Sequence, residues 1–468
     1  MNLHDLTITE AKNSLRKREI SSAELTKLYL DQIKKVNPIL NAYLTVTEEK
    51  AMKDAAHADK LFVENQDAPL LGIPFSIKDN FLTEGIRTTA SSKVLDSFIP
   101  PFNATVVERL KQAGIVCLGK TNMDAWAHGS STETSDYGVT KNPWDTNRLP
   151  GGSSGGGAAA MASDLCLAAI GSETAGSIRL PAAWCGVVGL KPTYGRVSRY
   201  GVVAMASSTD SPGPLTKTVE DAAIILQVLA GKDAFDGTTS DNKPEDYLAA
   251  MKTPRKMTIG ISEDYFIGVN GEIVKAVQDA ITLLEKKGHK VKKIKLFDPK
   301  YAIDVYTILQ RSEVSSNLAR FDGIRYGNDR SFFGEEARRR IMLGTYALSS
   351  GYYDAYYKKA QKVRTIIIED FNKAFAGVDV IVSPTTPVTA LPLGATKDSP
   401  MFGELMDVLV EPSSIAGICG INMPVGFSKE GLPIGMQIMA KQFAESTILN
   451  LAYQYEQETK WREEKPKI

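Results

Sequence analysis

The sequence is poor in histidine and cysteine, and it has no excess of charge and no long apolar run. Its 468 residues include four histidines and four cysteines. The cysteines, Cys117, Cys166, Cys185 and Cys419, lack C-x-x-C spacing, and three of the four lie in apolar runs. This pattern predicts small buried thiols of a reduced protein, and it argues against a disulfide framework or a zinc site. We therefore expect no metal in this chain.

The charge balance excludes a net positive field that would attract nucleic acid or an anionic membrane to the whole protein. Lys and Arg together number 55, as do Asp and Glu, so neither DNA nor an anionic membrane is favoured as a partner. No run approaches the roughly 18 apolar residues of a membrane span, and the first twenty residues lack the apolar core of a signal peptide. We expect a cytoplasmic protein, or one of an organellar matrix in a eukaryote, and any nucleic acid would have to be bound locally or by a partner.

The scarcity of histidine argues against a Ser-His-Asp triad. The stretch 152–156 fits the G-x-S-x-G pattern, but no strand directly precedes it. His289 is the one histidine that follows it, and its Lys-rich surroundings predict a solvated helix end. A serine nucleophile can instead use a lysine as its base, provided that burial lowers the lysine pKa.

A second short pattern, G-x-x-x-x-G-K-[ST] at 114–121, matches a phosphate loop. That loop must follow a strand and stay open around the phosphates. Here a helix precedes Gly114, and the residues between the two glycines are predicted to form a strand themselves. The pattern therefore does not predict an ATP site.

The most unusual stretch is 151–182, GGSSGGGAAAMASDLCLAAIGSETAGSIRLPA. Two loops rich in glycine and serine flank the apolar segment 165–170, which we expect to be a strand. Such loops can present backbone N–H groups and hydroxyls to an anion. Flexible linkers share this composition, but linkers do not enclose a strand. The stretch predicts a binding or catalytic site.

Helical and strand patterns alternate along the rest of the chain. A helix begins after Ser21 and ends near Pro38, and an apolar strand, 70–77, leads to Lys78. Further helices are predicted at 105–113, 222–230, 273–287, 301–320, most of 335–375, and from 445 onward. Further strands are predicted at 115–118, 257–261, 291–296, 378–383 and 433–440. The alternation favours an α/β fold with a large central mixed sheet covered by helices, in a single domain, 1–468.

Three motifs together resemble the amidase signature family: Lys78 in GIPFSIKDN, Ser153 in GGSSGGG, and Ser177 in GSETAGSIRLPA. The spacings between them agree with the family, and the signature core covers about 70–220. The resemblance implies a Ser-cis-Ser-Lys triad, with Ser177 as nucleophile, Ser153 as the bridging serine on a cis peptide, and Lys78 as the base. It also implies an oxyanion hole formed by the N–H groups of the residues before Ser177, namely Thr174, Ala175 and Gly176. By itself, Lys78 is also compatible with a strand-end ammonium that reaches water.

Segments 315–327 and 338–364 are similar to one branch of this family, the glutamine-hydrolysing A subunits of tRNA-dependent amidotransferases. The branch implies that Arg340 binds the carboxylate of glutamine, Asp407 its ammonium group, and Tyr306 a nearby atom. It implies no cofactor in this chain. Ammonia would pass to a tRNA-binding B subunit that uses ATP and Mg²⁺ to amidate Glu-tRNA(Gln) or Asp-tRNA(Asn), and a small C subunit would complete a heterotrimer.

Alternatives remain open at this stage. The chain could be a stand-alone amidase of small amides, whereas the intact Lys78, Ser153 and Ser177 argue against an inactive scaffold subunit. Arg340 could belong to a solvated run of charge, 338–340, and Asp407 to an ordinary helix.

The chain also departs from the family pattern in three places. Ala175 replaces a usual glycine, which would cost about 1 kcal/mol if positive φ were required. Trp126 and His128 stand near the expected substrate entrance, and the segment 327–331 is short.

Overall fold

A mixed β-sheet of 11 strands runs through the described part of the computed structural model, which covers residues 2–325, 327–397, 399 and 401–468. The strand order is β1-β3-β2-β4-β6-β5-β10-β11-β9-β7-β8. The strands are β1 (Tyr43–Val46), β2 (Pro74–Lys78), β3 (Val116–Thr121), β4 (Ala168–Glu173), β5 (Val188–Lys191), β6 (Ser211–Thr216), β7 (Thr258–Ser262), β8 (Lys290–Ile294), β9 (Val380–Pro384), β10 (Cys419–Phe427) and β11 (Pro433–Ala440). The predicted α/β fold with a mixed sheet is confirmed.

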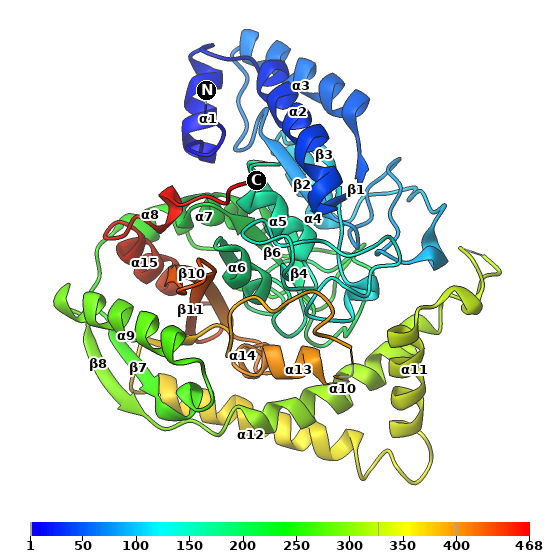
Figure 1. The fold of residues 1–468 in the computed structure, drawn as a ribbon, viewed down its shortest axis with the longest axis vertical. Helices are drawn as coiled ribbons and strands as arrows, with labels where there is room; N and C mark the ends of the chain where they lie inside the picture. The colour runs from blue at the N-terminus through cyan, green and yellow to red at the C-terminus, as the bar shows by residue number, and fades with distance from the viewer. Residues whose placement is uncertain (1, 326, 398, 400) are drawn as a thin grey trace.

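Helices cover both faces of this sheet (Figure 1). The α-helices are α1 (Ile8–Arg16), α2 (Ser22–Leu40), α3 (Glu48–Val63), α4 (Thr105–Gln112), α5 (Gly155–Ala162), α6 (Arg179–Cys185), α7 (Val219–Leu229), α8 (Tyr247–Lys252), α9 (Gly271–Lys286), α10 (Lys300–Leu318), α11 (Glu335–Ala347), α12 (Tyr357–Phe375), α13 (Phe402–Asp407), α14 (Glu411–Ile415) and α15 (Glu445–Glu456). The 3₁₀ helices are η1 (Lys93–Leu95), η2 (Ala125–Ala127), η3 (Glu263–Phe266), η4 (Arg330–Phe332) and η5 (Trp461–Glu463).

The parallel part of the sheet brings the two halves of the site together. Strand β2 pairs in parallel with β3 on one side and with β4 on the other. Lys78 is the last residue of β2, and Glu173 is the last residue of β4. Because parallel strands end at the same edge of a sheet, Lys78 meets the loop that follows β4.

Several predicted boundaries were wrong. Helix α2 runs through Pro38 to Leu40, and Asn41, at φ 53°, ends the helix. Of the apolar segment 70–77, only the part from Pro74 is strand. The preceding turn contains Gly72 at φ +74°, where a side chain would approach the Ser22 hydroxyl. Likewise, β4 begins at Ala168 and not at 165.

His289 is buried, so the prediction of a solvated helix end was also wrong. The chain turns at Gly288 and enters β8 directly, which places the imidazole Nδ1 where it accepts a hydrogen bond from the Met257 N–H at 3.2 Å. All four cysteines are free and buried, as predicted.

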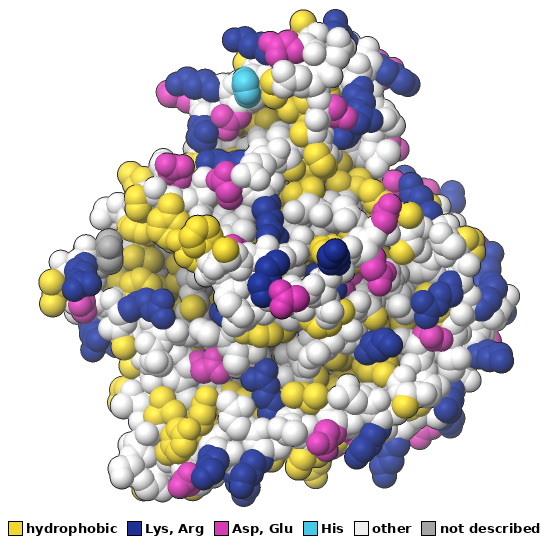
Figure 2. All heavy atoms as spheres, turned by 180° about the vertical axis from the view of Figure 1, so that it is seen from behind, with side chains coloured by type: hydrophobic (Ala, Val, Ile, Leu, Met, Phe, Trp, Pro, Cys, Tyr) yellow, Lys and Arg dark blue, Asp and Glu magenta, His cyan; other side chains and the backbone are white. Residues whose placement is uncertain are grey.

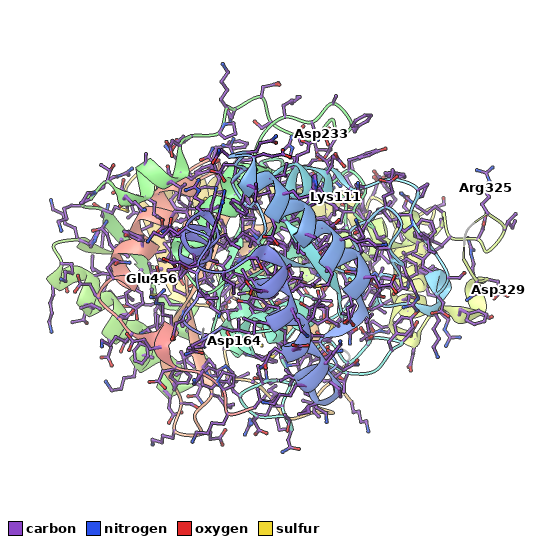
Figure 3. The ribbon with its side chains drawn as sticks, turned by 90° about the horizontal axis from the view of Figure 1, so that it is seen from above. Lys111, Asp164, Asp233, Arg325, Asp329 and Glu456 are labelled. Atoms are coloured by element: carbon purple, nitrogen blue, oxygen red, sulfur yellow. The ribbon has the colours of Figure 1, made fainter. Side chains whose placement is uncertain are left out.

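The surface is mixed in character. Figure 2 shows basic and acidic side chains scattered over one face, with apolar patches between them, in keeping with the equal numbers of both signs. Seen from above, Arg325 and Asp329 project at one outer edge, on the segment between α10 and α11, far from Glu456 at the end of α15 (Figure 3). No helix in the described ranges has both the length and the apolarity needed to cross a membrane.

Candidate active site

Lys78 is fully buried, and its amine is held by three hydrogen bonds. Nζ donates to the hydroxyls of Ser153 and Ser154, each at 2.8 Å, and to the carbonyl of Ser172 at 3.0 Å. Burial lowers the pKa of Lys78 to about 7, although the nearby carboxyl groups of Asp124, Asp210 and Glu173 act to raise it. The interpretation of Lys78 as a strand-end ammonium in water is therefore wrong, and a neutral amine is well populated near neutral pH.

Ser153 follows a cis peptide bond between Gly152 and Ser153. Residue 152 has to be glycine, because a side chain there would collide with the carboxylate of Asp124 and with the backbone of the loop at Ser131. Asp124 in turn fixes this loop. Its carboxylate accepts from the Ser131 N–H at 3.2 Å, and its own N–H donates to the Ser153 carbonyl at 3.3 Å. The bend that presents Ser153 to Lys78 thus rests on contacts between segments distant in sequence.

Ser177 lies in the loop between β4 and α6, next to the Ser153 loop. The Ser154 N–H donates to the Ser177 carbonyl at 3.1 Å, which ties the two loops together. The Ser177 side chain is buried, and no described residue makes a hydrogen bond to its hydroxyl. Within the described part of the chain, the N–H groups of Ala175 and Gly176 likewise have no acceptor. The same is true of the Thr174 N–H, so this loop offers free donors beside a free hydroxyl.

A buried ion pair holds the loop in this shape. Glu173 and Arg179 are both fully buried, and Arg179 Nε donates to the Glu173 carboxylate at 2.9 Å. The same carboxylate accepts from the Ile178 N–H at 3.0 Å and the Arg179 N–H at 2.9 Å. The Arg179 guanidinium also donates to Ser413, Gln437 and the Val410 carbonyl. Sequence reasoning missed this role of Arg179; the available signal was a charged residue inside the apolar run SIRLPA.

Ala175 causes no backbone strain, since its φ lies outside the left-handed region. The departure from the family glycine is therefore neutral at this position. Gly176 is the residue that cannot carry a side chain, because a Cβ there would collide with Asp407 and Val410. Positive φ occurs instead at Trp126 and Ala127, at 60° and 63°. The Trp126 ring packs on the Phe321 ring, with 4.8 Å between the ring centroids.

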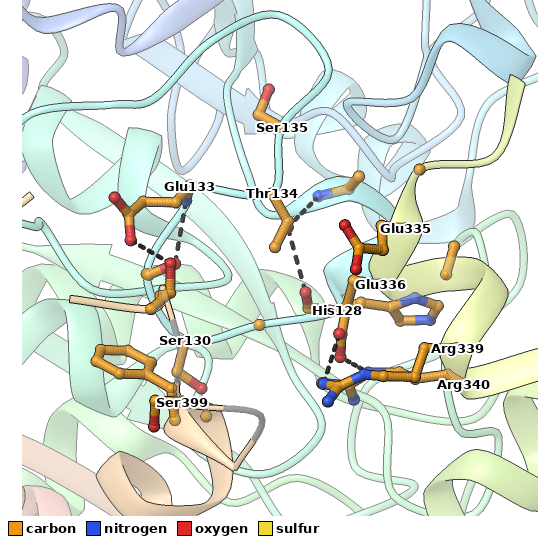
Figure 4. A pocket seen from close by; sticks show the side chains of 18 of the residues that line it. His128, Ser130, Glu133, Thr134, Ser135, Glu335, Glu336, Arg339, Arg340 and Ser399 are labelled. Carbon is orange, nitrogen blue, oxygen red and sulfur yellow. Dashed lines mark hydrogen bonds and ion pairs between the residues drawn. The ribbon is translucent and has the colours of Figure 1, made fainter. Parts of the chain in front are cut away.

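A cavity of about 590 Å³ lies between the segment 125–136, the start of α11 and the start of α13 (Figure 4). Its lining includes His128, Ser130, Arg340 and Glu404, but not Lys78 or Ser177. Ser130 connects the cavity to the loop 174–177. It lines the cavity, and its hydroxyl donates to Asp407 Oδ2 at 2.6 Å, while Asp407 packs against Gly176.

The three residues predicted to bind glutamine form a buried cluster, in which Tyr306 lies near the charges of both Arg340 and Asp407. Tyr306, Arg340 and Asp407 come from α10, α11 and α13. Arg340 is 4% exposed whereas Arg338 on the same helix is exposed, so the interpretation of 338–340 as one solvated run is wrong. Arg340 Nε donates to Glu336 at 2.6 Å. Burial raises the pKa of the Asp407 carboxyl well above its usual value, and Asp407 Oδ1 has no partner among the described residues.

Further charged residues of this cluster were not predicted. Arg311 donates to Glu404 at 2.8 Å, and both are buried. Glu411, at the start of α14, is fully buried, and neither carboxylate oxygen has a partner in the described structure. Burial, together with Asp407, raises the pKa of Glu411 well above its usual value. No sequence pattern marked these residues, because each lies in an isolated position of a different segment.

Lys120 of the phosphate-loop pattern is a structural residue. It lies in β3, is fully buried, and donates to the Phe81 carbonyl and to the hydroxyls of Thr83 and Thr88. The pattern therefore describes a strand, as the sequence predicted.

Comparison with known families and structures settles the relationship of the chain. The amidase family model matches residues 24–449. The chain belongs to the amidase family. Among its curated relatives is the A subunit of the glutamyl-tRNA(Gln) amidotransferase of Desulfatibacillum aliphaticivorans, 49% identical over 100% of both chains. The corresponding protein of Caldanaerobacter subterraneus subsp. tengcongensis is 50% identical over 98% of both.

Solved amidase-family structures are also similar. The crystal structure of the glutamyl-tRNA(Gln) amidotransferase A subunit from Thermotoga maritima is 41% identical, with a TM-score of 0.82, and the match covers 97% of this chain and 94% of that one. A 6-aminohexanoate cyclic dimer hydrolase is 26% identical, with a TM-score of 0.90, over 100% and 99% of the two chains. The amidase fold thus occurs both in a glutamyl-tRNA(Gln) amidotransferase subunit and in a 6-aminohexanoate cyclic dimer hydrolase.

Proposed function

We propose that this chain is the glutamine-hydrolysing subunit of a tRNA-dependent amidotransferase, with Lys78, Ser153 and Ser177 as its catalytic residues. The observation that carries the proposal is the 2.8 Å hydrogen bond between the Ser153 hydroxyl and the amine of Lys78, which is buried and readily neutral, beside a Ser177 hydroxyl that no described residue binds. The relatives that are about half identical over the full length support the glutamine-dependent branch. The cluster of Arg340, Asp407 and Tyr306 supplies a cation, a carboxylate and a phenol for a zwitterionic amino acid.

The chemistry follows from this arrangement. Neutral Lys78 accepts the Ser177 proton through the Ser153 hydroxyl, and Ser177 Oγ attacks the side-chain amide carbon of glutamine. The N–H groups of Thr174, Ala175 and Gly176 stabilise the oxyanion, at about 3 kcal/mol for each well-placed donor. The proton then returns to the leaving nitrogen, ammonia departs, and water hydrolyses the ester to glutamate. Ammonia would be used by a partner that binds the tRNA.

The deciding experiment measures ammonia release by the chain co-purified with its partner subunits. We expect glutamine to be hydrolysed with a far higher kcat/KM than propionamide, and Ser177→Ala to abolish release while the circular dichroism spectrum stays unchanged. A Ser177→Ala variant with substantial activity would refute the nucleophile. A wild-type preference for propionamide would favour the second candidate, a stand-alone amidase, which the likeness to the cyclic dimer hydrolase supports.

ATP and Mg²⁺ are assigned to the B subunit in this proposal, and a small C subunit completes the heterotrimer. Lys120, the lysine of the phosphate-loop pattern, is committed to internal hydrogen bonds. Calorimetry of ATP with the isolated chain should show no micromolar binding. Tight binding that disappears in Lys120→Ala would overturn this assignment.

A further inference from the structure

His128 is a buried imidazole in the wall of the 590 Å³ cavity, and it has no hydrogen-bond partner among the described residues. It directly follows η2, and it lines the cavity together with Arg340. The side chain is fully buried, and neither Nδ1 nor Nε2 has a hydrogen-bond partner among the described residues. An unpaired buried polar group costs free energy, so groups of this kind commonly mark a place that a ligand or water completes.

The neighbouring Arg340 makes hydrogen bonds with only part of its guanidinium group. Arg340 donates through Nε to Glu336, while its terminal nitrogens make no hydrogen bond to a described residue. Figure 4 shows the His128 imidazole beside the side chain of Arg340, on the same wall of the cavity. A free guanidinium end next to a free imidazole is a suitable arrangement for a carboxylate, which can accept several hydrogen bonds at once.

The imidazole next to these arginines stays neutral. Burial, and then the positive charges of Arg340 and Arg311, hold the pKa of His128 well below its usual value. A neutral ring has one N–H to donate and adds no positive charge beside the two arginines. It can therefore add a donor to the arginine site without repelling the arginines.

We propose that His128 is a specificity-determining residue that donates a hydrogen bond to the α-carboxylate of glutamine, beside the Arg340 guanidinium. The inference rests on the proposed function, because it names a further ligand for the same substrate. The competing explanation is that His128 only fills space next to Trp126. A space-filling residue would affect stability or all substrates equally, whereas a carboxylate ligand affects only substrates that carry the carboxylate.

The test compares variants of His128 in the co-purified complex. His128→Met keeps a similar volume but has no N–H, while His128→Asn and His128→Gln retain an N–H near the places of Nδ1 and Nε2. Glutamine is compared with 4-aminobutanamide, which is glutamine without its α-carboxylate. His57→Met, at an exposed position of α3, is the matched control.

We expect His128→Met to raise KM for glutamine about tenfold with kcat nearly unchanged, as for the loss of one hydrogen bond to a charged group. One of the two amide variants should restore KM to within about threefold of wild type. The kcat/KM for 4-aminobutanamide should not change in His128→Met.

Two results would overturn the inference: an unchanged KM for glutamine in His128→Met, or equal losses on both substrates. A readout that does not need turnover is calorimetric binding of glutamine to Ser177→Ala, with and without His128→Met, where the dissociation constant should rise about tenfold. Absence of glutamine hydrolysis in the wild-type complex would refute the proposed function itself. Measured glutamine hydrolysis with no effect of His128→Met would refute only the role of His128.

Discussion

Two buried charged clusters flank the loop 174–177, and they differ in how completely their polar atoms are paired. In the paired cluster, Glu173 and Arg179 bind each other and the backbone of the loop, with each oxygen and nitrogen of the pair in a hydrogen bond. In the open cluster, the described structure leaves Asp407 Oδ1, both oxygens of Glu411 and both nitrogens of His128 without partners.

In the paired cluster, folding itself supplies the hydrogen-bond partners, whereas in the open cluster a ligand would have to supply them. A fully hydrogen-bonded buried network fixes one geometry, whereas an unpaired buried group costs free energy that a complementary ligand can offset by binding to it. We therefore expect changes in the paired cluster to affect folding or catalysis on all substrates. Changes in the open cluster should affect the affinity for a zwitterion.

Lys78 is also fully paired, since its amine makes three hydrogen bonds, one of them to the carbonyl of Ser172 beside Glu173. Its replacement should have the largest effect on activity. Lys78→Arg should lower kcat/KM for glutamine by about 10³-fold or more, as much as Lys78→Ala, because a guanidinium stays protonated and cannot act as a base. With a wild-type pKa lowered to about 7, kcat/KM should rise with pH up to about 7 and level off above it, as the amine loses its proton. Initial rates of ammonia release measure both the loss of activity in Lys78→Arg and the pH dependence of the wild type. Near-normal activity of Lys78→Arg would mean that Lys78 only supplies charge.

Arg179→Met should cause the largest loss of stability. It leaves Glu173 buried without its cation, which costs about 3–5 kcal/mol in the free energy of unfolding measured with urea. The matched control is Arg255→Met, which removes an exposed pair with Asp379 and should change stability by less than about 1 kcal/mol. Equal effects of the two substitutions would show that the paired cluster has no special structural role.

Changes in the open cluster should affect substrate binding. Arg340→Ala and Asp407→Ala should each raise KM for glutamine by at least about tenfold, because one charge of the zwitterion loses its partner. The kcat/KM for propionamide, which carries neither charge, serves as the control and should change little. Wild-type KM values in both variants would remove the basis for the glutamine site.

Glu411→Gln should have the smallest effect, and it tests the cost of an unpaired group. The pKa of Glu411 is raised on folding, so the folded state binds this proton more tightly than the unfolded state does. Its contribution to stability is present at low pH and is lost as pH rises from the unfolded pKa through the folded one. We compare the free energy of unfolding of Glu411→Gln with that of wild type at two pH values. The difference should be about 1 kcal/mol more in favour of the variant at pH 8 than at pH 4. A constant difference across that range would indicate that Glu411 is paired or solvated.

The sequence alone identified the candidate catalytic residues because they lie in short, distinctive segments. Lys78 ends an apolar strand, and Ser153 and Ser177 occupy glycine-rich loops, so each could be recognised locally. The alternation of helices and strands likewise predicted the mixed sheet. Errors fell at boundaries such as Pro38 and at His289, where local composition does not report what packs against the segment.

Only the tertiary structure decided the surroundings of the candidate glutamine-binding residues. In the run 338–340, sequence could not tell which arginine is buried; the packing of α11 on α10 turns Arg340 inward and leaves Arg338 in solvent. The same holds for Glu411, His128 and the pair of Glu173 with Arg179, whose surroundings come from segments far away in the chain. Periodicity and motifs are local properties, whereas burial and charge pairing depend on which distant segments meet, and that is determined when the sheet and its helices pack together.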